Sequence, residues 1–432
     1  MMPTAIVESL DYEGRGVARV DGKAIFIEGA LTGERVEFSS YRKKPKFEQA
    51  TMARLLAQSP LRVEPKCAHF GMCGGCSMQH LESGAQVAVK QRVLEDSLWH
   101  LARLKPARIY PAIHGASWGY RYRARMGVRQ VTSKGGILVG FHEKKSSYIA
   151  DIQSCEVLPP LVGRNLMALR ELIAGLSAPD RMPQIELAVD ESRTVLVFRN
   201  LTPLTPKDVA CMLQFGREKG FSMWSQPGGP ETAAPLAADE PRDLSYTLPE
   251  FGLRLAFRPT DFTQVNVDIN RLLIRRAMQL LDPQPGERIA DLFCGLGNFS
   301  LPIARRGAHV IGVEGSDALV ERARSNAALN NLTALSEFHT ANLFEATSGS
   351  LVRLGPLDKM LIDPPREGAI AVVKALTDAS PRRIVYVSCN PASLARDAGV
   401  LVHDKGYSLA GAGVANMFPH TSHVESIALF ER

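Results

Sequence analysis

A thiol and two carboxyl groups occupy positions from which side chains in α/β proteins often do chemistry. Cys389 follows the apolar run 383–387, which is typical of a strand, and Asp363 follows a second apolar run that ends at Ile362. Glu425 belongs to the last predicted strand. In an open α/β sheet, ligands bind outside the carboxyl ends of the strands. We therefore expect Cys389 and Asp363 to face one crevice, within reach of Glu425.

A thiolate and a base together can replace a hydrogen on a pyrimidine ring. Sulfur can add to C6, which makes C5 an enolate-like carbon able to take an electrophilic methyl group. A base must then remove the C5 proton so that the thiol can leave. Cys389 is the candidate nucleophile and Glu425 the candidate base. Alternatively, Cys389 is a buried small hydrophobic residue, or Cys294 is the nucleophile, although it lies in a turn where a cofactor would bind. Cys211 is expected to be core.

The segment 288–298 predicts a strand, a tight glycine turn and a helix opened by Asn298. Gly295 and Gly297 allow a ligand to approach the backbone closely. Ser300 stands where the dinucleotide fingerprint requires a third glycine, so no pyrophosphate cradle is predicted.

Two polar residues after the next strands suit an adenosine ligand. Glu314 ends the strand 309–313, where a carboxylate can accept hydrogen bonds from both ribose hydroxyls. Asn342 follows the strand around Phe338, where its amide could read adenine. The succession of turn, acid and amide favours S-adenosylmethionine over NAD as the cofactor.

Four of the seven cysteines are placed like metal ligands. Cys67, Cys73 and Cys76 lie in a glycine-bearing segment, and Cys155 follows much later. Four thiolates suit a 4Fe–4S cluster or a zinc ion. The long gap to Cys155 is unlike common zinc ribbons and favours a cluster, while zinc and free thiols remain the alternatives. The first three cysteines do not have the C-x₃-C-x₂-C spacing of radical S-adenosylmethionine enzymes.

These residues require a multidomain α/β architecture to position them. Residues 1–60 alternate in short runs with glycine turns, which predicts a small OB-like β-barrel. Residues 61–260 predict a central α+β domain with the cysteines, a helix over 86–104 that could pack on the catalytic domain, and a mobile loop over 226–242. Residues 261–432 alternate strand and helix, which predicts a mostly parallel, Rossmann-like sheet.

Composition places the chain among reduced, RNA-binding proteins. No run of about 18 apolar residues and no secretory segment is present, so we expect a cytoplasmic protein. Residues 99–145 hold ten Lys/Arg against one acid, within a chain of net charge +6. Aromatic residues are interleaved with these charges, which suits RNA. An ordinary basic strand face is the alternative for Arg121, Arg123, Arg125 and Arg129.

The motifs 291–298 (DLFCGLGN), 362–366 (IDPPR) and 387–391 (VSCNP) resemble those of the RNA (uracil-5-)-methyltransferases that use S-adenosylmethionine. The resemblance runs over essentially the full length. It points to the branch that acts on 23S ribosomal RNA and carries both an N-terminal TRAM barrel and a 4Fe–4S cluster. The other ribosomal branch is expected to have the cluster without the barrel, and the transfer-RNA enzymes neither. A class I methyltransferase fold in a monomer is expected.

The resemblance also implies roles for individual residues. It implies cofactor contacts by Gln264, Phe293, Asn298, Glu314, Asn342 and Asp363. It implies cluster ligation by Cys67, Cys73, Cys76 and Cys155, with Cys389 as nucleophile and Glu425 as C5-proton base. Phe262 matches a position expected to stack on the flipped uracil. A non-catalytic RNA-binding module and a cluster-dependent oxidoreductase are the rival hypotheses; intact catalytic residues argue against the first, and the lack of a flavin or nicotinamide site against the second.

Overall fold

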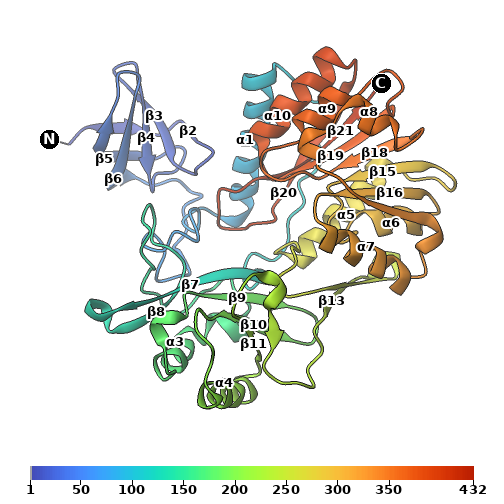
Figure 1. Ribbon diagram of the computed structural model, residues 1–432. Coiled ribbons are helices and arrows are strands. Elements are labelled where there is room, and N and C mark those ends of the chain that lie inside the picture. Colours follow the sequence, from blue (N-terminus) through green and yellow to red (C-terminus); the bar gives the residue numbers. More distant parts are fainter. Residues whose placement is uncertain (1) are drawn as a thin grey trace.

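The computed structural model describes residues 2–432, so Met1 of the predicted barrel lies outside the described residues. The chain forms three parts (Figure 1): an N-terminal barrel, a central sheet, and a large C-terminal sheet with its helices. Among residues 2–432, no helix combines the length and the apolar character that crossing a bilayer requires.

The N-terminal part is a six-stranded sheet that curls around an apolar core. Its strands are β1 (Thr4–Ile6), β2 (Ser9–Leu10), β3 (Gly16–Val20), β4 (Lys23–Glu28), β5 (Arg35–Lys43) and β6 (Phe47–Ala57), in the order β1-β5-β6-β4-β3-β2. Alternate residues point inward, so Ala18, Ile27 and Val36 are fully buried. This alternation is the pattern from which a barrel was predicted.

An irregular segment follows the barrel and leads into helix α1 (Ser83–Ala102). The buried side of α1 carries Leu94 and Leu98, which join the apolar core that contains residues of α10 (Pro391–Gly399). After α1 the chain runs beside strand β20 (Ser408–Ala415) and forms bridges there from Ile109 and Ile113. A piece of the N-terminal half therefore completes the C-terminal layers, as predicted for this helix.

The central part is a second six-stranded sheet with helices packed on it. Its strands are β7 (Arg123–Val131), β8 (Gly136–Gly140), β9 (Gln184–Val189), β10 (Thr194–Arg199), β11 (Ser222–Gln226) and β12 (Ala234–Pro235), in the order β12-β11-β10-β9-β7-β8. The helices are α2 (Pro160–Gly163), α3 (Leu166–Ala174) and α4 (Pro206–Lys219). The segment 226–242, predicted to be a mobile loop, instead adds strand β12 to this sheet through Trp224 and Ser225.

A hairpin of β13 (Leu244–Leu248) and β14 (Leu253–Phe257) leads into the C-terminal part. There the strands are β15 (Arg288–Leu292), β16 (His309–Glu314), β17 (Ser336–Thr340), β18 (Lys359–Ile362), β19 (Arg383–Ser388), β20 and β21 (Glu425–Glu431). The order is β17-β16-β15-β18-β19-β21-β20, and β21 runs antiparallel to its neighbours. The prediction of a mostly parallel sheet is confirmed.

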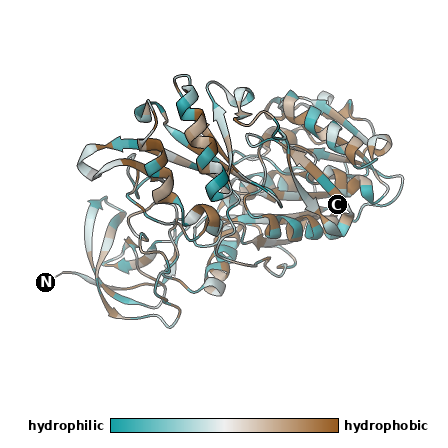
Figure 2. Ribbon diagram, turned by 90° about the horizontal axis from the view of Figure 1, so that it is seen from below, coloured by the Kyte–Doolittle hydropathy of each residue, from teal (hydrophilic) through white to brown (hydrophobic). Residues whose placement is uncertain are grey.

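Helices cover both faces of this sheet. They are α5 (Val267–Leu281), α6 (Ser300–Arg305), α7 (Asp317–Leu329), α8 (Ser348–Val352), α9 (Ile370–Ala375) and α10. Short turns are η1 (Thr132–Lys134), η2 (Pro179–Arg181), η3 (Pro230–Thr232), η4 (Pro249–Phe251), η5 (Thr333–Leu335), η6 (Leu343–Glu345) and the π-helical η7 (Val400–Asp404). The helices carry both hydrophobic and hydrophilic residues, as helices with one buried side do (Figure 2). Strands buried on both faces are expected where helices cover a parallel sheet.

Candidate active site

One cavity of about 530 Å³ lies at the carboxyl ends of β15, β16, β18 and β19. All nine residues predicted to bind cofactor, to react or to stack on a base line it: Phe262, Gln264, Phe293, Asn298, Glu314, Asn342, Asp363, Cys389 and Glu425. The topology explains the gathering, because the first crossover in a sheet of this order opens a crevice at the strand ends.

The turn after β15 brings backbone to the edge of this cavity. Phe293 has φ 64°, and Gly295 and Gly297 have φ 55° and 97°, so the chain turns sharply here. The N–H groups of Phe293 and Cys294 both donate to the carbonyl of Val313 (2.8 and 3.1 Å), which fixes the turn to β16. The turn thus presents backbone to a ligand, as its glycines predict.

Cys294 also borders the cavity but is only 4% exposed. A side chain at Gly312 would lie 2.9 Å from its Sγ, which shows how closely β16 passes beneath the thiol. Burial raises the pKa of Cys294 well above its usual value. The geometry therefore makes Cys294 a poor rival of Cys389 as a nucleophile.

The carboxylate of Glu314 is fixed by three backbone donors. It accepts hydrogen bonds from the N–H groups of Gly295 (3.1 Å), Gly315 (2.8 Å) and Ser316 (3.2 Å). These contacts tie the end of β16 to the glycine turn. A carboxylate oxygen can accept more than one hydrogen bond, so Glu314 retains capacity for the hydroxyls of a ligand.

An aromatic wall follows Asn342, whose Oδ1 accepts a hydrogen bond from the N–H of Phe344 (3.1 Å) and caps η6. The rings of Phe293 and Phe344 lie 5.7 Å apart between centroids. Phe344 is half exposed at the cavity edge and was missed by the sequence analysis. No sequence motif identifies Phe344, because its place in the site depends on its contact with Phe293, which is distant in the sequence.

Asn298 does not open helix α6, which begins at Ser300 without a side-chain cap. Its side chain instead forms a reciprocal amide pair with Asn270 of α5, with both N···O distances 3.0 Å. The hydroxyl of Tyr246 donates to the same Oδ1 (2.8 Å). The Asn298 carboxamide oxygen is therefore engaged twice, which leaves one N–H for a ligand. Asn270 and Tyr246 belong to distant segments, so spacing gave no signal of either.

Cys389 and Glu425 are brought together by strand pairing. Ser388, the last residue of β19, pairs with Ser426 of β21, which brings the adjacent residues Cys389 and Glu425 to the same end of this antiparallel pair and into one cavity. Burial, Glu425 and Asp363 raise the pKa of Cys389 to about 11, against the lowering effect of Arg366. The thiol is accordingly protonated in the free protein at neutral pH.

Both carboxyl groups of the site also hold their protons more tightly than usual. Burial, and then the nearby Asp363, raises the pKa of Glu425 well above its ordinary range. Burial raises the pKa of Asp363 to about 7. Perturbed acids that gather in one cavity are a common property of catalytic sites.

Arg366, Phe418 and His423 line the cavity beside Cys389 and were given no role from the sequence. Arg366 Nη2 donates to His423 Nδ1 (3.0 Å), and the rings of Phe418 and His423 lie 5.4 Å apart. Burial and Arg366 lower the pKa of His423 to about 4, so the imidazole is neutral and accepts this bond. The carbonyl of Arg366 accepts from Asn390 Nδ2 (3.0 Å), which holds the IDPPR loop at the end of β19.

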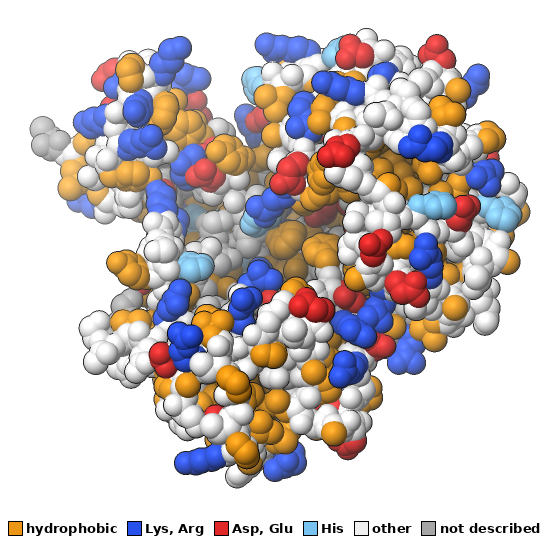
Figure 3. All heavy atoms as spheres, viewed as in Figure 1, with side chains coloured by type: hydrophobic (Ala, Val, Ile, Leu, Met, Phe, Trp, Pro, Cys, Tyr) orange, Lys and Arg blue, Asp and Glu red, His pale blue; other side chains and the backbone are white. Residues whose placement is uncertain are grey.

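A groove of about 740 Å³ continues from Cys389 toward the barrel. It is lined by Asp11, Tyr12 and Glu13 of a barrel loop, by the exposed side of α1, and by Arg366, Cys389 and His423, which it shares with the first cavity. The surface is hollowed between the barrel, the central sheet and the C-terminal part, with Lys and Arg along the edge (Figure 3). Cys389 therefore lies where the cavity meets the groove.

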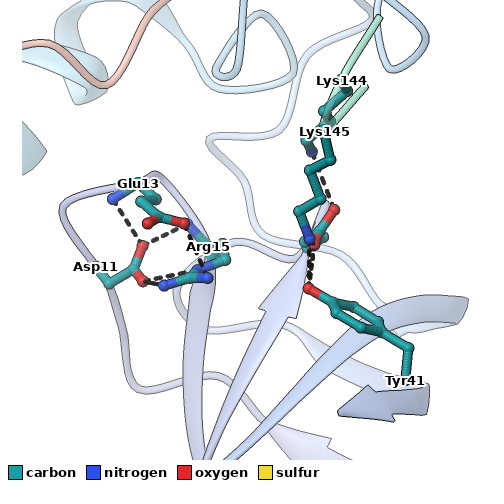
Figure 4. A network of polar contacts seen from close by, with 7 residues as sticks. Asp11, Glu13, Arg15, Tyr41, Lys144 and Lys145 are labelled. Atoms are coloured by element: carbon teal, nitrogen blue, oxygen red, sulfur yellow. Dashed lines mark hydrogen bonds and ion pairs between the residues drawn. The ribbon is translucent and has the colours of Figure 1, made fainter. Parts of the chain in front are cut away.

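Polar contacts hold the barrel at this groove (Figure 4). Arg15 bonds Asp11 in the loop, with Nη2 to Oδ2 at 2.7 Å. Across the interface, Glu28 of β4 pairs with Lys144 (3.3 Å) and with Lys145, both from the turn after β8. Lys145 also lies over the ring of Tyr41 at 4.4 Å. The barrel is thus fastened to the central part by charge pairs and a cation–π contact.

The basic run on β7 is not one RNA-facing surface. Arg123 Nη2 donates to the carbonyl of Asp261 (2.6 Å), and burial lowers the pKa of Arg123 to about 10. Arg121 lines an internal cavity, while Arg125 and Arg129 are exposed. Arg125 pairs with Glu186 at 2.9 Å. Arg121 and Arg123 therefore make internal contacts, whereas Arg125 and Arg129 lie at the surface.

The four predicted metal-binding cysteines line one small cavity. Cys67, Cys73, Cys76 and Cys155 meet there with Arg121 and Phe141. Burial raises the pKa of Cys76 to about 12 and that of Cys155 to about 11. Within residues 2–432 the side chains form no ready-made group of three or more His, Cys, Asp or Glu in metal-binding geometry.

The residues of this cavity nevertheless suit an anionic cluster. Its lining offers four thiols, the number of thiolates that a 4Fe–4S cluster takes, and Glu156 as the one other acidic group. The Nε of Arg121 is buried there without a hydrogen-bond partner. A buried guanidinium donor without a partner is costly, and an anionic centre would supply its acceptor. The donor set therefore fits the predicted group.

Comparisons with known proteins agree with this geometry. Residues 251–432 match the family model described as tRNA (Uracil-5-)-methyltransferase, and residues 4–38 match the TRAM domain. The chain is 67% identical to the protein named 23S rRNA (uracil(1939)-C(5))-methyltransferase RlmD of Aromatoleum aromaticum and 66% identical to the protein of that name of Azoarcus sp.. Both comparisons cover 100% of this chain and 100% of the relative.

Among solved structures, the chain is similar to the Pyrococcus abyssi tRNA (uracil-54, C5)-methyltransferase in complex with S-adenosyl-L-homocysteine. The TM-score is 0.75 at 24% identity, and the match covers 99% of this chain and 100% of that chain. The shared fold includes the N-terminal barrel. The expectation that transfer-RNA enzymes lack the barrel was therefore wrong, and the barrel alone does not separate the two kinds of relative.

Proposed function

The chain belongs to the RNA (uracil-5-)-methyltransferase family, and from this premise we propose how its own residues methylate C5 of a uridine in 23S ribosomal RNA. The relatives' names give that uridine as number 1939. The observation that carries the mechanism is that Cys389 and Glu425, which flank the paired residues Ser388 and Ser426 in sequence, line one cavity with the cofactor residues.

The cofactor end of the cavity is assigned to the side chains that follow β15, β16 and β17. S-adenosylmethionine, when bound, supplies an electrophilic methyl group. Glu314 would accept the ribose hydroxyls, Asn342 would bond the adenine, and the remaining N–H of Asn298 would donate to the ligand. Gln264, Phe293 and Asp363 complete the contacts predicted for it. All of these side chains already line the same space.

The reacting end is assigned to Cys389 and Glu425. The sulfur of Cys389 bonds to C6 of the uracil, and the C5=C6 electron pair becomes available at C5 for the methyl group. Glu425 then takes the C5 proton, the C5=C6 bond re-forms, and the C6–S bond breaks to release the thiolate. Phe262, 71% exposed at the cavity rim, is placed to stack on the extruded base.

The raised pKa values of Cys389 and Glu425 bear on how the reaction starts. Cys389 and Glu425 both have raised pKa values, so the resting cavity holds protons that the reaction must displace. A cationic sulfonium brought into this cavity favours the ionised forms of nearby acids. Binding of the methyl donor should therefore favour the thiolate of Cys389 and the carboxylate of Glu425.

We assign a 4Fe–4S cluster to Cys67, Cys73, Cys76 and Cys155, with Arg121 as its charge partner. Methyl transfer as drawn moves no net electrons, so the cluster's role is structural. Protein purified without oxygen should contain iron and sulfide near four each per chain. Stoichiometric zinc without sulfide would contradict the assignment, and a reductant requirement of the loaded enzyme would contradict the structural role.

The nucleophile is tested with RNA that carries 5-fluorouridine at the target. Fluorine at C5 cannot leave as a proton, so the bond between C6 and Cys389 should persist after methyl transfer. We expect a covalent complex on a denaturing gel with the unaltered protein and with the control variant Cys211→Ala. Cys211 is a suitable control because its thiol is exposed and does not line the cavity. Cys389→Ala should form none while still binding RNA. An equally stable complex in Cys389→Ala would assign the role to another thiol, first to Cys294.

A further inference from the structure

The loop between β20 and β21, residues 416–424, delivers the proposed base to the active site. Phe418 and His423 of this loop line the cavity, and Glu425 is the first residue after it. Most of the bonds that fix the loop come from outside the C-terminal sheet. They come from α1 and from the segment that follows Cys76, more than 300 residues earlier in the chain.

His420 is the residue at which these contacts meet. Its backbone has φ 65°, a left-handed conformation that residues other than glycine seldom adopt. The N–H of His420 donates to Gln86 Oε1 (2.8 Å), and its carbonyl accepts from the N–H groups of Ser77 (2.9 Å) and Met78 (3.0 Å). Surrounding contacts must hold such a conformation, and here three of them do.

The side chains around His420 reinforce the same position. Gln86 Nε2 lies 3.2 Å from His420 Nδ1 and donates to the carbonyls of Met78 (3.1 Å) and Leu81 (2.8 Å). Gln86 is fully buried. The ring of Trp118 stacks on the His420 ring with centroids 3.8 Å apart. The buried carboxamide of Gln86 thus joins three parts: α1, the segment that follows Cys76 (residues 77–81, here called the cysteine segment) and the loop.

Lys90 of α1 forms a second, separate anchor. Its Nζ donates to Asn416 Oδ1 and to the carbonyl of Phe418, both at 2.8 Å, and the residue is 1% exposed. Two further bonds complete the attachment: the Tyr120 hydroxyl donates to the carbonyl of Pro419 (2.9 Å), and Ser77 Oγ accepts from the N–H of Ser422 (3.0 Å). Most residues of the loop are therefore held from outside.

We propose that Gln86 and Lys90 are positioning residues for the elimination step: they fix the β20–β21 loop, and through it Glu425, against α1 and the cysteine segment. This inference rests on the proposed role of Glu425 as C5-proton base. The residues assigned to the ribose and the adenine, Glu314 and Asn342, follow β16 and β17, whereas this loop joins β20 to β21 at the other end of the sheet. Loss of an anchor should therefore spare cofactor binding and methyl transfer, and slow the removal of the C5 proton.

The test compares Gln86→Leu with Gln91→Leu and Glu425→Gln. Gln91 is a matched control, because it lies on α1 and its amide donates to Glu95 of the same helix (2.8 Å). Hydrogen exchange of peptides covering 416–424 is measured without RNA. Formation and decay of the methylated covalent complex with unmodified RNA are followed on denaturing gels, and S-adenosylmethionine affinity is measured by calorimetry.

In Gln86→Leu we expect exchange in the loop to rise at least about tenfold and the methylated complex to decay about 10- to 100-fold more slowly, since small displacements of a catalytic group have effects of this size. Cofactor affinity should stay within about twofold. Lys90→Met should have the same effects through its separate contacts, which covers a failure of Gln86→Leu to fold.

The proposal would be overturned if Gln86→Leu and Lys90→Met both showed the same hydrogen exchange in the loop, and the same decay of the complex, as the control Gln91→Leu. A complex that accumulates in Glu425→Gln but in neither anchor variant would overturn it while leaving the function of Glu425 intact. Normal turnover in Glu425→Gln would overturn the role of the base, and the positioning role with it.

Discussion

The pH dependence of Cys389 reactivity follows directly from its surroundings. Burial, with Glu425 and Asp363 adding to it, raises the pKa of this thiol from 9.0 to about 11. Only the thiolate attacks a disulfide, and the thiolate fraction increases with pH until the pKa is passed. In the RNA-free protein, Cys389 should therefore become reactive at a higher pH than an ordinary thiol.

The expected size of the effect combines two opposing terms. At pH 7.5 a pKa near 11 instead of 9.0 lowers the thiolate fraction about 100-fold. The more basic thiolate is also the better nucleophile, and a Brønsted coefficient of about 0.4–0.5 over two units restores about tenfold. Cys389 should thus react roughly tenfold more slowly than an ordinary thiol. Its rate should continue to rise about tenfold per pH unit above pH 9, where the ordinary thiol levels off.

The assay is brief exposure to a small neutral disulfide across pH 7–11, followed by mass spectrometry of the Cys389 peptide, with a short cysteine peptide in the same mixture as reference. Partial burial slows the access of the disulfide to Cys389 equally at every pH. The test is therefore the shape of the plot of reaction rate against pH. A Cys389 profile that levels off together with the reference peptide would refute the reasoning from burial and neighbouring carboxyl groups.

Three further changes should separate the roles assigned above. Glu425→Gln should accumulate a methylated covalent complex with unmodified RNA on denaturing gels, because addition needs no base at 425 and elimination does; normal turnover would exclude Glu425 from the mechanism. Glu314→Ala should weaken S-adenosylmethionine binding more than tenfold by calorimetry, since each hydrogen bond to a charged group contributes about 1.5–3 kcal/mol; an unchanged affinity would place the ribose elsewhere. Cys73→Ser should lower iron content, solubility and RNA affinity in a filter-binding assay more than cofactor affinity, and equal losses of both affinities would contradict a local role for the cysteines.

The strand-end motifs could be read from the sequence because each is local. A glycine turn after a strand, an acid after the next strand and a proline pair after a third each place a side chain at the same edge once the sheet is parallel. Glu314, Asp363 and Cys389 were found in this way, and the structure brings all three to one cavity. Strand pairing then explains why Glu425, distant in sequence, reaches the same place.

The supporting residues could not be found in this way, since they depend on contacts between distant segments. Asn270 engages Asn298 across 28 positions, and Gln86 engages His420 across 334. Nothing in the neighbourhood of either residue distinguishes it from an ordinary helix position. The same holds on the basic strand: the spacing of Arg121 and Arg123 shows an alternating charge pattern, but only the packing shows that these two side chains make internal contacts.

The docking of α1 on α10 has a consequence for biosynthesis. Residue 391, the first of α10, is made roughly 290 residues after the end of α1, which at about 5–20 residues per second is a delay of ~15–60 s. During that interval the side of α1 that carries Leu94 and Leu98 has not yet met its partner. Until α10 is made, the apolar side of α1 therefore stays without the partner that covers it in the folded protein. Residues 251–432 produced on their own would expose the complementary surface on α10, and they would be prone to aggregate unless residues 83–113 were supplied.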